Sequence, residues 1–322
     1  MVRTGHLPFD FADYLYSLTG ANWEVRELSG GNANFVVRAT QARSTLNESP
    51  VAPPYFAKFP DVQFSQKRQV VEARALYLFK ADPQLSNVLE SNTRVIRIPS
   101  LLHHDEAQHV LVQSDLGSHP SLDAYLSSPT TTAYSAALAG HSLGRFLANL
   151  NHAYDSVPDA LSPPSNIAAA LANDDAEAVM QGVIANATRF IKEAGVHDWE
   201  TLGVRALGHW KSRKRTTFCQ GDIWFGTITV DDTAPNRVNE GGRSLVLKIC
   251  DWEFAGPNHP AADIAQLGTL LWIHCSAYLS DAPLAIRRIF TSVIPIKVTY
   301  GAAAAKAGRL RRGVLRVLLP AF

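Results

Sequence analysis

The chain has few cysteines, little net charge and no long hydrophobic run, and each of these absences narrows its class. Its 322 residues include three cysteines in no paired spacing, so the sequence offers neither a disulfide framework nor a cysteine-based zinc site. The formal net charge of +1 gives no overall field that favours nucleic acid or an anionic membrane as partner. No run of about 18 apolar residues predicts a membrane span, and the first residues lack the apolar core of a signal peptide. We therefore expect a cytoplasmic protein that binds neither nucleic acid nor membrane.

Two short acidic motifs stand about thirty residues apart in the second half of the chain. Asp222 follows Gly221 and precedes an apolar run, and Asp251 ends a predicted strand over 245–250. An acid in apolar surroundings is poised to accept a proton, and an acid at a strand end that faces a cleft is a good magnesium ligand. Each is also compatible with an ordinary turn aspartate. Because a β-like stretch and a polar turn separate them, we expect the two acids to lie close together, as phosphoryl transfer requires.

The first part of the chain is predicted to be rich in strands, with one helix. Strands rich in β-branched and aromatic residues alternate with turns, and a helical period follows from Gln66. Gly117 lies at the break after the last of these strands. The expected elements are strands at 24–28, 35–39, 55–60, 95–98 and 109–113, a polar insertion at 41–54 and a helix at 66–80.

After Gly117 the pattern becomes mainly helical, and the two acidic motifs lie on β-hairpin material within it. This order predicts an α+β fold of the bilobal, protein-kinase-like type, with a small β-rich N-lobe over 1–114 and a larger helical C-lobe over 115–322. Helices are expected at 133–154, 166–195, 261–279 and 283–300.

Three residues in the first part are candidates for binding phosphate, together with an acid that would position one of them. Gly30 and Gly31, between two strands, would let the backbone approach a nucleotide, although an isolated pair is more typical of a plain hairpin turn. Lys58 lies in an apolar strand, where a lysine is costly unless it is paired or at an edge. Glu72 on the following helix is its candidate partner, and a surface lysine with a solvated glutamate is the alternative. Asp263 is expected to cap or brace the helix that begins near it.

Taken in order, these motifs resemble the aminoglycoside phosphotransferase and choline kinase superfamily over about residues 20–275. No single element is decisive, but the ordered set is specific. The matching residues are Leu28-Ser29-Gly30-Gly31-Asn32-Ala33-Asn34-Phe35, Lys58, Glu72, Gln113-Ser114-Asp115-Leu116-Gly117, Leu150-Asn151-His152, Gln220-Gly221-Asp222, Asp251-Trp252-Glu253-Phe254-Ala255-Gly256-Pro257 and Asp263-Ile264-Ala265.

The resemblance implies a role for each motif. Asp222 would be the catalytic base or hydroxyl-orienting acid, and Asp251 the main magnesium ligand. Lys58 would bind nucleotide phosphate and Glu72 would position it, while residues 113–117 would line the adenine site, with Gln113 and Asp115 among the cofactor-binding residues. The implied cofactors are ATP and Mg²⁺, and the implied substrate is a hydroxyl on a small polar or cationic molecule held by the helical lobe.

Two positions depart from the superfamily pattern. Gln220 stands where histidine is usual, and glutamine still forms the hydrogen bonds that support the loop. Thr227 stands where an asparagine normally binds the second magnesium, and a hydroxyl has a shorter reach than an amide carbonyl. Thr227 is therefore a predicted but poorer metal ligand, and its loss as a contact would weaken a site that works by charge neutralisation.

Three functions remain open from the sequence. The first is an ATP- and magnesium-dependent phosphotransferase acting on a small-molecule hydroxyl. The second is a pseudokinase-like binding protein that keeps the cleft but turns over slowly or not at all. The third is the same fold diverted to other chemistry on a hydrophobic metabolite, with Trp224, Phe225 and Trp252 forming an apolar pocket around the acids, although these aromatics are more typical of loop packing.

Overall fold

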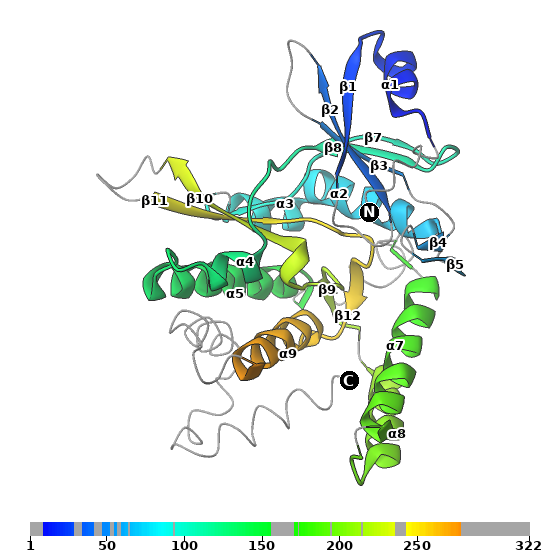
Figure 1. Cartoon of the computed structure of the whole chain (residues 1–322), viewed down its shortest axis with the longest axis vertical. Helices are drawn as coiled ribbons and strands as arrows, with labels where there is room; N and C mark the ends of the chain where they lie inside the picture. The colour runs from blue at the N-terminus through cyan, green and yellow to red at the C-terminus, as the bar shows by residue number, and fades with distance from the viewer. Residues whose placement is uncertain are drawn as a thin grey trace.

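The structure is a computed structural model, and it describes most of the chain up to residue 277 (Figure 1). Three predicted site residues, Gly30, Gly31 and Lys58, lie outside the described residues, as does the helix expected at 283–300. The described ranges are 9–28, 34–41, 47–51, 55–56, 59–63, 65–92, 94–155, 171–172, 174–193, 195–213, 215–235 and 243–277.

A five-stranded antiparallel sheet with strand order β1-β2-β3-β8-β7 forms the first part of the molecule (Figure 1). Helix α1 begins at its cap Asp10 and ends at Gly20, and it adds Phe11 and Leu15 to a small core with Val37 and other strand residues. The elements are α1 (Phe11–Thr19), β1 (Trp23–Leu28), β2 (Phe35–Gln41), β3 (Asn47–Val51), β7 (Leu101–Asp105) and β8 (Val110–Ser114).

Two predictions about the first part were wrong. The stretch expected to be a polar insertion at 41–54 contains β3, which pairs with β2 on one side and β8 on the other. Its sequence has little β-propensity, so pairing with both neighbours outweighs the local preference. The single strand expected at 55–60 is instead a pair, β4 (Tyr55–Phe56) and β5 (Phe59–Gln63), that run antiparallel to one another.

Two helices and a short strand lie between β5 and β7 in the chain. Helix α2 agrees with the helix predicted at 66–80, and α3 begins at Asp82, whose side chain accepts hydrogen bonds from the amides of Gln84 and Leu85. The elements are α2 (Lys67–Ala81), α3 (Pro83–Glu90) and β6 (Ile96–Arg97).

The second part is mainly helical, as predicted, and its strands carry the two acidic motifs. The hairpin of β10 and β11 joins β6 in a three-stranded sheet, in which β11 and β6 run parallel. Strands β9 and β12 pair separately. The elements are α4 (Leu122–Ser127), α5 (Ala133–Asp155), α7 (Asp174–Glu193), α8 (Trp199–Ser212), β9 (Thr217–Cys219), the 3₁₀ turn η2 (Phe225–Thr227), β10 (Ile228–Pro235), β11 (Arg243–Ile249), β12 (Gly256–Asn258) and α9 (Ala262–Ala277).

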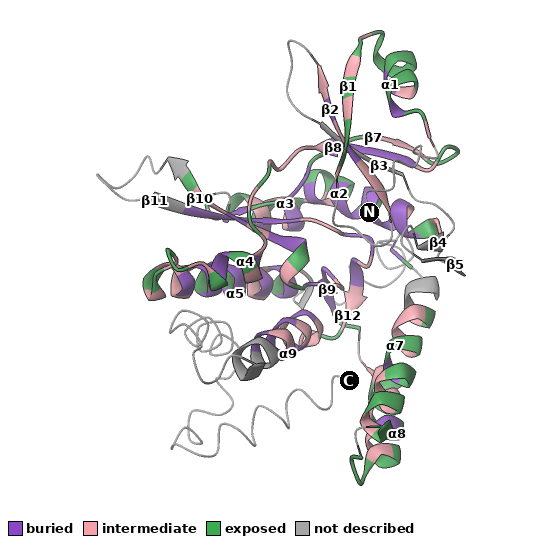
Figure 2. Ribbon diagram, in the orientation of Figure 1, coloured by how far each residue is buried: buried purple, intermediate pink, exposed green. Residues whose placement is uncertain are grey.

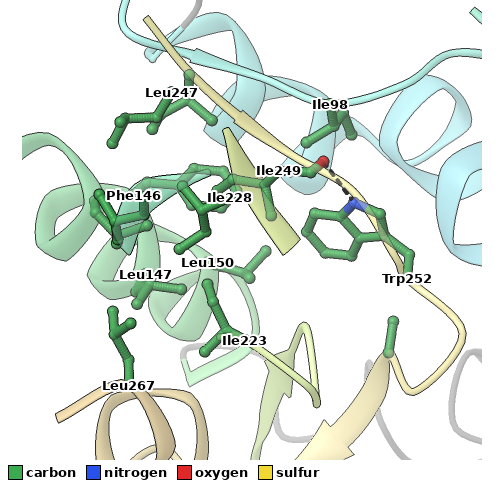
Figure 3. Packing of buried hydrophobic residues seen from close by; sticks show 14 of the residues in the cluster. Ile98, Phe146, Leu147, Leu150, Ile223, Ile228, Leu247, Ile249, Trp252 and Leu267 are labelled. Carbon is green, nitrogen blue, oxygen red and sulfur yellow. Dashed lines mark hydrogen bonds between the residues drawn. The ribbon is translucent and has the colours of Figure 1, made fainter. Parts of the chain in front are cut away.

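The larger hydrophobic core draws side chains from both sides of residue 114. In the close-up of Figure 3, Leu147 and Leu150 of α5 lie with Leu247 of β11, Leu267 of α9 and Ile98 from the segment after β6. Residues of α2 and α3 join the same cluster. The purple ribbon of α5 and β11 in Figure 2 shows this burial, whereas α7 and α8 are largely exposed.

The division into lobes at residues 114 and 115 stays a prediction, because the core crosses it. Within the described ranges, no helix combines the length and apolar character needed to cross a bilayer.

Candidate active site

The loop that carries Asp222 is pressed against the loop that carries Asp251. The connection starts where β9 pairs with β12, which places Cys219 opposite Gly256. Gly221 then adopts a φ of +92°, and a β-carbon at this position would lie 2.1 Å from the carbonyl oxygen of Phe254. Only glycine accommodates both the left-handed backbone and this close approach. A glycine is thus required at position 221, directly before Asp222, where the two loops meet.

Asp263 holds the Asp222 loop from helix α9. Its buried carboxylate accepts hydrogen bonds from two consecutive loop amides, Gln220 N at 2.9 Å and Gly221 N at 2.9 Å. The sequence predicted a structural acid that caps or braces its own helix. In the structure, the Asp263 carboxylate instead supports the Asp222 loop, because it accepts hydrogen bonds from amides 42 and 43 positions earlier in the chain.

Gln220, the first departure from the superfamily pattern, ties the two loops together. Its amide oxygen accepts a hydrogen bond from Asp222 N at 2.9 Å. Its amide nitrogen donates to the carbonyl oxygens of Asp251 at 2.5 Å and Cys250 at 3.2 Å. A glutamine amide supplies both a donor and an acceptor, so it supports both loops as predicted.

The Asp222 carboxylate is itself fixed by a residue that the sequence did not single out. Gln266 Nε2 donates a hydrogen bond of 2.6 Å to Asp222 Oδ1. Burial raises the pKa of Asp222, and the hydrogen bond from Gln266 opposes this rise because it favours the ionised form. The Asp222 carboxylate is therefore enclosed and oriented, which suits the role of base predicted for it.

Thr227, the second departure from the superfamily pattern, forms hydrogen bonds through its hydroxyl with the backbone of its own loop. The oxygen accepts from Trp224 N at 3.1 Å, and the hydroxyl is within donating distance of the carbonyl oxygens of Trp224 at 3.0 Å and Asp222 at 3.4 Å. These contacts hold the η2 turn that follows the base. The side chain is buried, and its place as a metal ligand stays a prediction.

Asp251 sits directly after β11 in an unusual backbone conformation. Its φ is +67°, a left-handed value that costs energy for any residue other than glycine and is best tolerated by aspartate and asparagine. Burial, and after it the charge of Asp222, together raise the pKa of Asp251 to about 7, and the charge of Arg68 opposes this rise. Because the charge of Asp222 disfavours the ionisation of Asp251, the two acids form an environment that fits a bound cation.

Helix α2 reaches the Asp251 loop through buried charges. Arg68 pairs with Glu253, with 3.2 Å between Nε and Oε2, and both side chains are almost completely buried. Burial lowers the pKa of Arg68 and raises that of Glu253 well above its usual value, although the pairing opposes both shifts. Glu72 Oε1 accepts from Trp252 N at 3.4 Å. Glu72 therefore lies beside the loop of Asp251, and its predicted partner Lys58 lies outside the described residues.

Asn34, the last residue of the predicted glycine-turn motif, completes this network. Its amide nitrogen donates to Glu253 Oε2 at 3.2 Å, and its amide oxygen accepts from Arg68 Nη2 at 2.9 Å. The end of the β1–β2 turn is thereby joined to α2 and to the Asp251 loop. Sequence reasoning missed Arg68, for which an arginine on the core-facing side of a helix was the available signal.

The connector between the two parts carries the predicted adenine-site residues. Gln113 is buried, and its Oε1 has no hydrogen-bond partner among the described residues, so this oxygen fits a ligand that donates a hydrogen bond. The Asp115 carboxylate instead pairs with Arg38 at 2.7 Å and accepts from Gly117 N at 2.6 Å. Lys248 Nζ donates to the carbonyl oxygen of Leu116 at 2.8 Å, which fastens the connector to β11.

The three aromatic residues near the acids do not form an apolar pocket together. Trp252 is fully buried against Phe79, with ring centroids 4.7 Å apart, and its indole N–H donates to Ile249 O (Figure 3). Phe225 packs against the core, and Trp224 is 40% exposed. Two of the three aromatics therefore pack the loops.

The structure thus brings together Asp222, Asp251 and Glu72, while Gln113 and Asp115 lie on the connector at the end of β8. Among the described residues, no cluster of three or more His, Cys, Asp or Glu side chains forms a self-sufficient metal site. A magnesium ion carried by nucleotide phosphates needs only one or two carboxylates from the protein, which this arrangement supplies.

The fold that carries this site is also found in proteins of known structure. No family model matches the chain. A solved complex of gentamicin with the aminoglycoside phosphotransferase APH(2'')-IIa aligns with a TM-score of 0.50 and 14% identity over 98% of this chain and 100% of the other. The chain has the fold of the aminoglycoside phosphotransferases. The predicted bilobal, kinase-like α+β class is therefore confirmed. Macrolide 2'-phosphotransferase MphH from Brachybacterium faecium aligns at 0.44 and 15% identity, covering 95% of each chain.

A sequence relative extends this picture. The 4-hydroxytryptamine kinase of Psilocybe cyanescens is 24% identical over 250 residues, which cover 74% of this chain and 65% of that kinase. This chain therefore matches less than two thirds of the kinase's own length. The match agrees with the predicted resemblance to the phosphotransferase and choline kinase superfamily.

Proposed function

We propose that the protein is an ATP- and magnesium-dependent phosphotransferase that acts on a hydroxyl of a small molecule. One observation carries the proposal. Gln220 joins the backbones of Asp222 and Asp251, and Asp222 raises the pKa of Asp251, so a candidate base and a candidate metal ligand share one rigid frame. Phosphoryl transfer depends on such positioning more than on covalent chemistry by the protein.

Each side chain has a role that its surroundings support. Asp222 would orient the acceptor hydroxyl and accept its proton through the carboxylate oxygen that Gln266 leaves open. Asp251 would hold magnesium, with Thr227 as the lesser predicted ligand, and Gln113 Oε1 would accept a hydrogen bond from the nucleotide base. When bound, magnesium-ATP supplies the phosphoryl group and offsets the negative charge of the acids.

The sequence relative guides the choice of acceptor. Because 4-hydroxytryptamine kinase is named for a hydroxylated aromatic amine, we infer an acceptor that carries a hydroxyl on a small amine or a similarly polar molecule. Suitable probes are 4-hydroxytryptamine and, from the structural neighbour, gentamicin.

The test has a binding step and a turnover step. Magnesium-ATP at about 100 times its dissociation constant should stabilise the protein by about 2.7 kcal/mol in a thermal shift assay, and the shift should shrink when EDTA is added. Transfer to each probe acceptor is then followed by mass spectrometry.

Asp222→Asn should lower transfer by about 10²- to 10⁴-fold and leave the thermal shift intact. Asp13→Asn, at an exposed position of α1, is the matched control and should change neither measurement.

A pseudokinase-like binding protein is the second candidate, and one observation favours it. The Thr227 hydroxyl is engaged by the loop backbone, so the second metal contact of the superfamily is weakened. Stabilisation by magnesium-ATP without transfer to any acceptor would support this second function. No stabilisation by any nucleotide would contradict both.

A further inference from the structure

Helix α9 directs two polar side chains, one turn apart, at the loop that carries the candidate base. Asp263 in its first turn accepts from the loop amides, and Gln266 three residues later donates to the Asp222 carboxylate. We propose that Gln266 is a positioning residue for Asp222, which holds one carboxylate oxygen so that the other faces the acceptor hydroxyl. This inference rests on the proposed phosphotransfer.

The contact is short and specific. The 2.6 Å between Gln266 Nε2 and Asp222 Oδ1 is at the lower end for a hydrogen bond to a charged oxygen. Among the described residues, Gln266 is the one side chain that hydrogen-bonds to this carboxylate. The backbone of Asp222 is held separately, through its N–H donated to Gln220 Oε1. Main chain and side chain are therefore fixed from two different elements, which leaves the base little rotational freedom.

The helix that carries Gln266 is itself immobilised. Ala265, Leu267 and Leu271 of α9 are buried, and the latter two belong to the main core. Asp263 fastens the first turn of the helix to the loop backbone. The distance from the Gln266 amide to the base is thus set by core packing rather than by a flexible segment.

The chemistry of an amide suits this task. A glutamine N–H donates to a carboxylate without carrying charge, so it orients the acid without cancelling the negative charge that attracts the acceptor proton. It also does not exchange its own proton near neutral pH, so Asp222 stays the only proton acceptor of the pair. A lysine or arginine at the same place would form an ion pair and compete with that role.

The experiment separates the hydrogen bond from packing. Gln266→Met keeps the length of the side chain without a donor, and Gln266→Glu keeps its shape but replaces the donor by an oxygen. Both should lower kcat by about 10- to 100-fold, the scale of a misplacement of about 1 Å, with the KM for ATP changed less than about 2-fold. Gln266→His retains a ring N–H donor and should recover part of the loss.

Thr269→Val is the matched control one turn further along α9. The Thr269 hydroxyl donates to Ala265 O within the helix, so its loss tests the helix without touching the base. Its kcat should equal that of the wild type. If Gln266→Met has an unchanged kcat, or if Thr269→Val shows the same loss, the positioning role is wrong while the proposed function stands.

Crystal structures give a reading that does not depend on turnover. In Gln266→Met, the Asp222 side chain should leave the orientation it has in the wild type or become disordered, with the loop backbone unchanged. An Asp222 side chain in the same orientation in both structures would overturn the inference. A wild-type protein that binds magnesium-ATP but transfers no phosphate would overturn the proposed function, and the crystal structures would still decide the role of Gln266.

Discussion

The loop of Asp222 and the loop of Asp251 meet at Gly221, yet they are held in different ways. The Asp222 loop donates hydrogen bonds to Asp263 and accepts one from Gln266, both on α9, and one partner in each bond is an uncharged amide. The Asp251 loop is held by the buried charges of Arg68 and Glu253, together with Glu72 and Asn34.

The positions of the two acids are therefore controlled by different parts of the chain. The position of the base is set within the helical part, by a helix anchored in the main core. The position of Asp251 depends on α2 and on the end of the β1–β2 turn, which precede the connector in the chain. A buried ion pair adds little net stability but is costly to break on one side, so the second loop is the more sensitive of the two.

The largest effect is expected when the ion pair is broken on one side. Arg68→Met leaves the Glu253 carboxylate buried without its cation, and it should lower the free energy of unfolding by about 3–5 kcal/mol, measured by urea denaturation. In hydrogen exchange, the amide of Trp252 should lose protection, whereas those of Gln220 and Gly221 should keep theirs.

Two variants control the Arg68 experiment. Arg189→Met removes an exposed arginine whose pair with Glu193 lies on the helix surface, and it should cost less than about 0.5 kcal/mol. Adding Glu253→Gln to Arg68→Met should restore part of the stability, because no charge is then left unpaired. Equal loss of protection in both loops would show that the two are held as one unit.

The reverse change loosens the Asp222 loop. Asp263→Asn replaces an acceptor oxygen by an NH₂ group that faces a loop amide, so it should cost about 2 kcal/mol and increase exchange of the Gln220 and Gly221 amides. Protection of Trp252 N should change little. The comparison fails if Asp263→Asn affects Trp252 as strongly as it affects the amides it contacts.

A smaller effect is expected from pH, and the raised pKa of Asp251 contributes to it. Since the folded pKa of Asp251 is about 7 and its ordinary value is 3.8, the folded state keeps a proton that the unfolded chain releases. Stability of the metal-free protein should therefore fall as pH rises from about 4 to 7. Asp251→Asn should reduce this fall, which the raised pKa values of Asp222 and Glu253 would still maintain in part. The variant should be more stable than the wild type by about 1–2 kcal/mol at pH 8, measured by thermal denaturation.

Magnesium should act in the opposite direction to the proton. Because the ion binds the ionised carboxylate, stabilisation of the wild type by magnesium-ATP should grow as pH rises through about 7. Asp13→Asn should follow the wild type in both experiments. A wild-type stability that is flat between pH 4 and 7 would contradict the shifted pKa of Asp251.

The smallest effect is expected at Thr227. Thr227→Asn offers an amide oxygen to the second metal position and should raise the transfer rate by about 2- to 10-fold, measured at saturating magnesium-ATP. The gain is limited because the new side chain must also replace the hydroxyl contacts with the Trp224 backbone. An unchanged rate, with the loop intact in a crystal structure, would show that the second metal position is not used.

The sequence predicted the parts of the fold that local pattern determines. Helices α2, α5 and α9 follow clear helical periods, and the ordered motifs indicated the kinase-like fold. Strand β3 was missed because its residues have no preference for strands and acquire it from neighbours on both sides. The pairing of β11 with β6 was equally out of reach, since it joins segments about 150 positions apart.

Motifs in the sequence mark the acids of the candidate site, but they do not mark the neighbours that contact those acids. Asp222, Asp251 and Glu72 were marked by their motifs. Gln266 lies three positions after Asp263 in a run with no recognisable motif. Arg68 lies on α2, and its ion-pair partner Glu253 is 185 positions away in the sequence. Only the folded chain shows which polar side chain meets which carboxylate.

The core that crosses residue 114 limits how this protein can be taken apart. The apolar face of α3 packs on α5, β6 pairs with β11, and the apolar face of α2 packs through Phe79 on Trp252. A fragment that ends at the connector would turn these faces to water and would aggregate rather than fold. Chimaeras that exchange acceptor specificity with a related kinase should therefore carry α2, α3 and β6 along with the helical half, and exchange only the outer five-stranded sheet separately.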